Sequence, residues 1–178
     1  MKDYKVEVVA YDSNWPIQYE KEKTELSKAI TGFDVNFDHF GSTSIPNVAA
    51  KPIIDIGIDI KDFSVADQIL KKVELLGYNY ESSIENFIPD CRFLWKGEQS
   101  QGPFDIHKIH VHIRSINSDN RINAILFRDY LRSHPETAEI YSEMKILLAK
   151  QFREDQGKYN HEKTTFVNTI LSIARKAL

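Results

Sequence analysis

One stretch of the sequence combines residue types that bind phosphate and metal ions. It reads His-Phe-Gly-Ser-Thr-Ser-Ile-Pro from His39 to Pro46, and Lys51 and Asp55 follow shortly after. A glycine beside small hydroxyl residues lets backbone N–H groups approach a phosphate closely, and Ser and Thr add side-chain donors. Asp55, on the strand that follows, is placed to hold a divalent cation. The candidate phosphate ligands are Gly41, Ser42, Thr43, Ser44 and Lys51.

This stretch matches neither of two common phosphate-binding motifs. It lacks the Gly-Lys-Ser/Thr of a P-loop, and its glycine spacing differs from that of a dinucleotide-binding fingerprint. The alternative is an ordinary Ser/Thr turn followed by a solvated aspartate, since short Gly-Ser turns are common. Composition alone leaves both interpretations open.

Two histidines could complete a metal site with Asp55. His110 and His112 are two residues apart in a segment that alternates like a strand, so they share one face. If that strand lies beside the strand of Asp55, the three residues could form a site with two histidines and one carboxylate. Imidazoles ligate Mn, Fe, Ni or Zn more readily than Mg. One histidine could instead act as a general base or pair with a phosphate, and both could simply be solvated.

Several basic residues could bind phosphate from elsewhere in the chain. Arg128 and Arg132 are one helical turn apart, so two guanidinium groups could clamp phosphates from one face. Arg92, on an expected strand, allows the same interpretation. Ion pairs within the fold, such as one to Asp129, are the alternative for all three. The pairs Tyr141 with Lys145 and Tyr159 with Lys163 are interpreted mainly as helix packing, with lysine ends reaching solvent.

The stretch His39–Asp55 resembles the signature of the GrpB family. Further segments resemble that family in the expected order and extend over nearly the whole chain. They are Tyr11-Asp12 with Trp15, Arg92-Phe93, His110-Val111-His112, Phe127–Arg132, and Tyr141 followed by Lys145.

The resemblance implies a fold of the nucleotidyltransferase superfamily, and such domains are fused to dephospho-coenzyme A kinase in some bacteria. In that superfamily a Gly-Ser pair contacts a triphosphate, and carboxylates on neighbouring strands hold two metals. Gly57 stands where the second carboxylate is expected, two residues after Asp55. Asp59 lies about 13 Å from Asp55 at ~3.3 Å per residue, too far to share metals about 4 Å apart. Asn47 also replaces a glycine usual in the family.

The elements that must position these residues follow from hydrophobic periodicity and turn residues. Ile54, Ile56, Ile58 and Ile60 alternate with Asp55, Gly57 and Asp59, which predicts a strand with one apolar face. We predict strands at 6–10, 33–40, 53–60, 91–96 and 104–113, with a turn at 97–103. We predict helices at 15–30, 65–76, 119–133, 135–152 and 158–176. This order predicts an α/β or α+β fold, with a small mixed sheet, flanking helices and a helical C-terminal portion.

Length and composition narrow the class of protein. The 178 residues fit one domain over residues 1–178, and the formal net charge of −3 argues against extended nucleic-acid binding. Cys91 is the only cysteine, so we expect it in the core of an intracellular protein. No apolar run is long enough to span a membrane and no secretory signal is evident, so we expect a cytoplasmic location. The sequence does not predict an oligomeric state.

The sequence and the resemblance together predict an enzyme of the nucleotidyltransferase type. It would act on a nucleotide or another phosphate ester with a divalent metal (Mg, Mn or Zn). Asp55, His110 and His112 are the predicted catalytic residues and metal ligands. Gly57 favours an alternative, a non-catalytic nucleotide-binding module that lacks the second carboxylate. A third possibility is a domain that only binds partner proteins.

Overall fold

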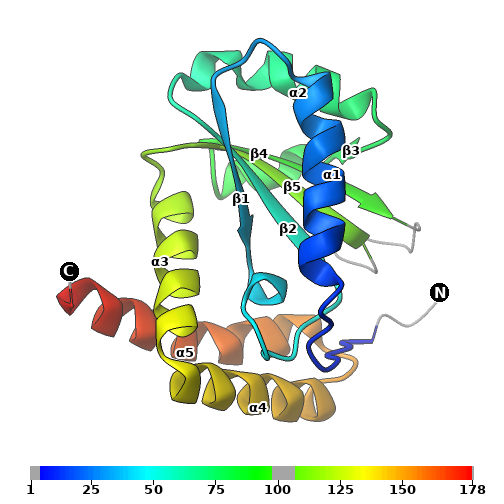
Figure 1. The fold of residues 1–178 in the computed structure, drawn as a ribbon. Helices are drawn as coiled ribbons and strands as arrows, with labels where there is room; N and C mark the ends of the chain where they lie inside the picture. Colours follow the sequence, from blue (N-terminus) through cyan, green and yellow to red (C-terminus); the bar gives the residue numbers. More distant parts are fainter. Residues whose placement is uncertain (1–4, 98–106, 178) are drawn as a thin grey trace.

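The computed structural model describes residues 5–97 and 107–177, which form a five-stranded sheet with helices on both sides (Figure 1). The helices are α1 (Trp15–Ala29), α2 (Ala66–Glu74), α3 (Asp119–Ser133), α4 (Pro135–Gln151) and α5 (Gln156–Lys176). The strands are β1 (Val35–Phe40), β2 (Ile54–Ile60), β3 (Asn79–Tyr80), β4 (Cys91–Gly97) and β5 (His107–Ser115). Three short 3-10 helices are η1 (Ser42–Ser44), η2 (Phe63–Val65) and η3 (Ser82–Asn86).

The sheet is mixed, and its strands lie in the order β1-β2-β5-β4-β3. β2 and β5 pair in parallel at its centre, while the β1–β2, β4–β5 and β3–β4 pairs are antiparallel. Two strands far apart in sequence, β2 and β5, are therefore direct neighbours. Any side chains at matching positions on one face of these two strands lie close together.

One face of the sheet carries the main apolar core. Ile54, Ile56, Ile58 and Ile60 are all almost fully buried, and they pack with residues of α1 and α2. Helix α1 begins at Trp15 and α2 presents Ile69 and Val73 to the same core. Because successive residues of a strand point to opposite faces, Asp55, Gly57 and Asp59 lie on the other face. The alternation seen in the sequence thus separates a core face from a polar face.

The C-terminal helices α3, α4 and α5 pack against one another and against the loop that follows η1. Ile45 and Val48 of this loop are buried among Leu131, Tyr141 and Ile170. In Figure 1 these three helices lie beyond β1 and at the end of the sheet where η1 begins. The helical portion therefore closes over the same loop that the sequence identifies as a phosphate-binding candidate.

The predicted fold class is confirmed, and most predicted elements appear within a few residues of their expected bounds. The predicted strand at 6–10 is wrong. Val9 forms a single bridge to Ala50, and the N–H of Val6 donates to the carbonyl of Arg153, so this segment joins loops rather than the sheet. The two-residue strand β3 was not predicted, because it is too short for any periodicity. Residues 98–103 of the predicted turn and 104–106 of the last predicted strand lie outside the described residues.

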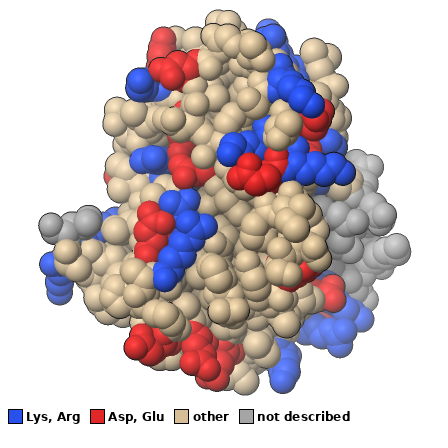
Figure 2. Space-filling view, in the orientation of Figure 1, with Lys and Arg blue, Asp and Glu red and all other residues tan. Residues whose placement is uncertain are grey.

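Surface charges of both signs are interspersed on the face shown in Figure 2, where Lys and Arg side chains lie among Asp and Glu side chains.

Across the described residues, none of the helices has the length and apolar character needed to cross a membrane.

Candidate metal centre and pocket

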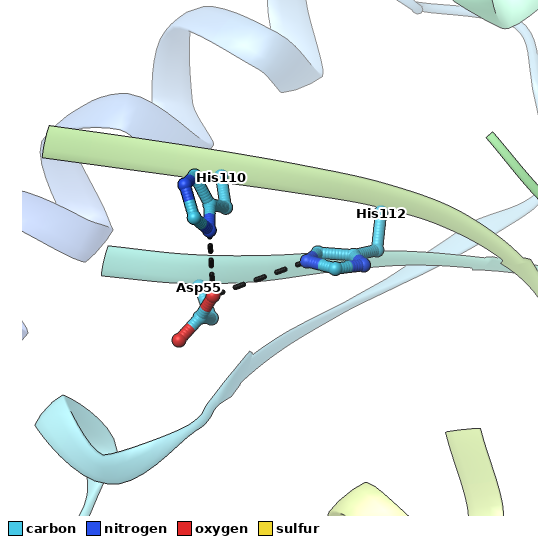
Figure 3. Close-up of side chains that lie close together, drawn as sticks. All are labelled: Asp55, His110 and His112. Atoms are coloured by element: carbon cyan, nitrogen blue, oxygen red, sulfur yellow. Dashed lines mark ion pairs between the residues drawn. The ribbon is translucent and has the colours of Figure 1, made fainter. Parts of the chain in front are cut away.

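The parallel pairing of β2 and β5 brings Asp55, His110 and His112 together. Asp55 pairs in register with His110, and Gly57 pairs with His112. The Nδ1 atom of His110 lies 3.3 Å from Oδ1 of Asp55, and Nε2 of His112 lies 3.9 Å from the same oxygen. Figure 3 shows both imidazoles pointing to the carboxylate from the neighbouring strand. The two strands are therefore neighbours, which is the condition for a site made of these three residues.

The three side chains suit a transition-metal ion. One donor atom from each lies within 4.8 Å of the others. Two bonds of about 2.1 Å span at most about 4.2 Å, so small side-chain rotations would be needed to bring all three donors to one ion. Two imidazoles and a carboxylate form a mixed nitrogen and oxygen set, which suits Mn, Fe or Zn better than Mg.

The electrostatics of the site favour a neutral His112 and an ionised Asp55 at neutral pH. Burial lowers the pKa of His112 to about 3, with the Asp55 charge opposing the shift, so this imidazole is neutral. Burial alone would raise the pKa of Asp55, but a hydrogen bond from His110 and the nearby imidazoles lower it below its ordinary value. A metal ion binds an ionised carboxylate and a neutral imidazole, so Asp55 and His112 are in the states that a metal ion requires.

The second nitrogen of His112 faces the core. Its Nδ1 lies 3.9 Å from Sγ of Cys91, which is fully buried as expected. Burial raises the pKa of the Cys91 thiol to about 12, so the thiol is protonated and belongs to the packing around the site. The ring of Phe93 contacts both His110 and His112, with centroids 5.0 and 4.9 Å apart. These contacts fix the plane of the imidazoles, as outer contacts do in metal sites.

Gly41 lies directly against the carboxylate of Asp55. Its φ of +69° is a conformation that residues with a side chain rarely adopt, and a Cβ atom there would lie 2.1 Å from Oδ2 of Asp55. The glycine is therefore required twice, by its backbone angle and by the space that Asp55 occupies. Asn47 also has a positive φ, of 64°. This explains a family preference for glycine there, since Asn tolerates that region better than most residues.

The hydroxyl groups of the loop mostly hold the loop itself. The hydroxyl of Thr43 donates to the carbonyl of Ile53, and that of Ser44 donates to the carbonyl of Gly41. Ser42 Oγ lies 3.4 Å from the hydroxyl of Tyr141 on α4. Ser42 and Thr43 line the pocket described below, whereas Ser44 is buried within the loop.

A pocket of about 330 Å³ opens over the Asp55 carboxylate. Its wall comes from the sheet, the loop after β1, the segment around η3, and helices α4 and α5. Asp55 is the only acid among its described lining residues, whereas three lysines line it. The lining residues used below are Ser42, Lys51, Asp55, His110, His112, Lys145, Tyr159 and Lys163.

Two of these lysines were assigned to helix packing in the sequence. For Lys145 that assignment is wrong in one respect, because the side chain does not reach solvent and is only 2% exposed. Lys163 is half-buried and lines the same pocket. One feature of the sequence could have identified Lys145 and Lys163 as pocket residues. Each lies one helical turn after a tyrosine, Tyr141 or Tyr159, which places its amine on a helix face that is otherwise apolar.

The three predicted phosphate-binding arginines contact protein groups. Arg128 donates to Asp38, to Asp129 and to the backbone carbonyl of His39, while Arg132 donates twice to the carbonyl of Ser44. Arg92 pairs with Asp67 of α2 and with Glu85 of η3. None of the three is among the described residues that line the pocket over Asp55. Arg128 and Arg132 instead hold the strand end and loop that present Gly41.

A second polar cluster lies four residues further along β2. Asp59 is completely buried and accepts one hydrogen bond from Nε of Arg114 at 2.8 Å and one from Nε of Arg121 at 2.9 Å. Nη2 of Arg114 forms an ion pair with the same Oδ1 atom, also at 2.8 Å. Arg114 lies over the ring of Phe40, 4.3 Å from its centroid. A Cβ atom at Gly57 would lie 2.1 Å from Nη2 of Arg114. The guanidinium group therefore occupies the space in which a second carboxylate would stand.

Relatives of known sequence match nearly the whole chain. The family model described as GrpB protein matches residues 5–172. UPF0157 protein YqkA of Bacillus subtilis is 32% identical over 172 residues, which are 97% of this chain and 48% of that relative. The chain thus spans about half the length of YqkA. Dephospho-CoA kinase of Mycolicibacterium paratuberculosis is 30% identical over 157 residues, covering 79% of this chain and 39% of the kinase.

Two solved structures share the fold of this chain. The crystal structure of GrpB from Enterococcus faecalis covers 96% of this chain and 98% of its own, with a TM-score of 0.82 and 31% identity. Cid1 poly(U) polymerase, solved bound to MgATP, has a TM-score of 0.52 at 14% identity and matches over 81% of this chain and 44% of its own. At that identity the likeness shows the fold alone, which is nucleotidyltransferase-like. The chain belongs to the GrpB protein family.

Proposed function

We propose that this protein binds a nucleotide or another phosphate ester together with one divalent metal ion. Asp55, His110 and His112 would hold the ion at the floor of the pocket. The observation that carries the proposal is their convergence on one carboxylate oxygen beneath a cavity lined by three lysines. Metal ligands and cations together in one cavity are what a phosphate group requires.

The site favours one metal rather than two. Two-metal nucleotidyl transfer needs carboxylates that share ions about 4 Å apart. Position 57 has no room for a side chain, and Asp59 is already engaged by Arg114 and Arg121. Asp55 is thus the one carboxylate that β2 offers to the pocket. A single ion held by Asp55 and two imidazoles fits these constraints.

Two forms of the function remain within this proposal. In the first, the protein is an enzyme of phosphorus-group transfer, in which the bound metal would act as a Lewis acid on a phosphate oxygen. The nucleotidyltransferase-like fold and the neutral His112 support this form. In the second, the protein binds the ligand without reaction, which the blocked position 57 supports. Incubation with nucleoside triphosphates and Mn, followed by product analysis, distinguishes the two.

The proposal is tested by thermal-shift measurements with Mn, Zn and Mg, each with and without ATP or dephospho-coenzyme A. We expect Mn or Zn to raise the melting temperature more than Mg does, and a ligand at 100 times its Kd adds about 2.7 kcal/mol. The double variant His110→Ala/His112→Ala should lose the metal effect. His161→Ala, at an exposed histidine on α5, is the matched control and should keep it. An equal response to Mg and Zn in wild type and double variant would refute the metal site.

A further inference from the structure

Lys145 of α4 is a buried amine without a hydrogen-bonded partner among the described residues. Its side chain is 2% exposed, and no described residue accepts a hydrogen bond from Nζ. Nζ of Lys145 lies over the ring of Tyr141, 4.3 Å from the ring centroid. A buried ammonium without a hydrogen-bonded partner is costly to a fold. Burial and the nearby charge of Lys163 accordingly lower the pKa of Lys145 to about 6.

Two further lysines reach the same cavity from different elements. Lys51, between η1 and β2, lies 5.1 Å from the ring centroid of Tyr159, and Lys163 lies 5.7 Å from the same ring. The ring of Tyr159 thus brings together an amine from the loop and an amine from α5. All three lysines line the pocket that contains Asp55.

We propose that Lys51, Lys145 and Lys163 form an anion subsite for a chain of at least two phosphoryl groups, on the pocket wall that faces Asp55. This inference deepens the proposed function and rests on it for the identity of the pocket. Lys145 supplies the central contact, because its amine has no hydrogen-bonded partner among the described residues. Lys51 and Lys163 flank it from the loop and from α5.

The charge of the pocket selects a polyanion over a single phosphate. Three amines share the pocket with one carboxylate among the described lining residues, and a divalent ion at Asp55 would add two further positive charges. Lys145, with a pKa of about 6 in the free protein, would gain its charge when an anion binds beside it. A monophosphate neutralises at most about two of these charges, whereas a di- or triphosphate carries about three or four. Ammonium groups are compact donors that bind phosphate oxygens as point charges, so they tolerate a flexible phosphate chain.

The proposed subsite should also lower the stability of the ligand-free protein. An amine kept in an apolar wall for a ligand should weaken the free protein, as happens where function demands a strained site. Replacement of Lys145 by methionine, a residue of similar length without charge, should therefore stabilise the protein while it abolishes anion binding. A lysine that served only packing would show the opposite, a loss of stability without an effect on anions.

The test is titration calorimetry with inorganic tripolyphosphate, first with EDTA and then with Mn. We expect wild type to bind under both conditions, and Lys145→Met and Lys163→Met to lose at least about tenfold in affinity, or 1.4 kcal/mol. Lys150→Met, which removes an exposed lysine from the same helix, should change affinity less than about twofold.

Three results would overturn the inference. These are a wild type that binds no tripolyphosphate, a Lys145→Met variant with wild-type affinity, or an equal loss in Lys150→Met. Lys145→Gln repeats the measurement if the methionine variant does not fold. Binding of Mn is measured separately on the same samples. Mn binding with an unchanged anion affinity in Lys145→Met refutes the subsite alone, whereas a wild type that binds no Mn refutes the metal site.

Discussion

Asp55 and Asp59 are two aspartates on one face of one strand, and their surroundings differ completely. Asp59 is 0% exposed and receives two charged hydrogen bonds, one from Arg114 and one from Arg121. Asp55 faces two imidazoles at 3.3 and 3.9 Å and borders a cavity. β5 supplies a partner in both cases, with His110 beside Asp55 and Arg114 beside Asp59, while Arg121 comes from α3.

This difference indicates a structural role for Asp59 and fits the ligand-binding role that we propose for Asp55. The charge of Asp59 is balanced by two permanent cations inside the protein, so no ligand is needed to complete that cluster. The neighbours of Asp55 include a neutral His112, which supplies lone pairs rather than positive charge. We propose that a cation from solution completes this group of donors at the edge of the cavity. Residue type alone does not distinguish these two aspartates, but their neighbours do.

Each aspartate cluster also depends on one glycine. A Cβ atom at Gly41 would lie 2.1 Å from the Asp55 carboxylate, and one at Gly57 would lie 2.1 Å from Arg114. Gly41 makes room for the site in the loop, while Gly57 makes room for an ion pair in the sheet. The absent second carboxylate is therefore a consequence of packing around Arg114.

Gly57→Asp, which would restore the carboxylate pair of nucleotidyltransferases, should have the largest effect on stability. The new side chain would displace Arg114 from Asp59, and we expect a loss of at least about 4 kcal/mol in the free energy of unfolding. Urea denaturation measures it, with Gly57→Ala as the smaller change at the same position. A stable Gly57→Asp variant would show that the sheet accommodates a second carboxylate after all.

The variants Asp59→Asn and Asp55→Asn compare the two clusters directly. Asp59→Asn leaves Arg114 and Arg121 without their buried counterion, so we expect a loss of about 3–5 kcal/mol. Asp55→Asn should cost less than about 1 kcal/mol while it weakens Mn or Zn binding at least tenfold, about 1.4 kcal/mol. Denaturation and metal titration on both variants give the result. If Asp55→Asn unfolds and Asp59→Asn does not, the assignment of the two clusters is reversed.

The pH dependence of stability should change in Lys145→Met. Between pH 6 and about 10.4 the unfolded chain holds a proton that the folded chain has released, since the folded pKa is about 6. The stability of wild type therefore rises with pH by up to about 1.4 kcal/mol per unit, and the variant lacks this slope. Denaturation at about pH 6 and about pH 9 should show the advantage of Lys145→Met shrinking as pH rises. An advantage that is constant with pH would mean that Lys145 is charged in the fold.

Arg132→Lys should have the smallest effect. Lysine would keep the charge but lose one of the two hydrogen bonds to the carbonyl of Ser44, so we expect a loss of about 0.5–1.5 kcal/mol in stability. Affinity for tripolyphosphate should change less than about twofold. A tenfold loss of affinity at unchanged stability would instead place Arg132 at the ligand phosphates, as the sequence suggested.

Local patterns explain what could be predicted from the sequence. The alternation of isoleucines with Asp55 and Asp59 identified a strand and its two faces, and turn residues separated the three C-terminal helices. The loop His39–Pro46 and the pair His110/His112 were identified as candidates from composition and spacing. The family resemblance identified the fold class, which local patterns alone left broad.

Long-range pairing explains what could not be predicted. The register of Asp55 with His110 depends on how β2 and β5 align, and no local pattern fixes the alignment of parallel strands. The pairing of Arg114 with Asp59 depends on the same register. Lys145 was misjudged because helical spacing does not reveal that α4 packs over the loop of Ser42. These features arise only when segments distant in sequence meet.

The most direct test of the metal centre is anomalous diffraction from crystals of wild type grown with Zn. We predict one anomalous peak at about 2.0–2.2 Å from a carboxylate oxygen of Asp55 and from one nitrogen each of His110 and His112. Crystals of Asp55→Asn, grown in parallel, should lack that peak. A wild-type map without a peak between these three residues, while Zn occupies other sites, would contradict the central claim.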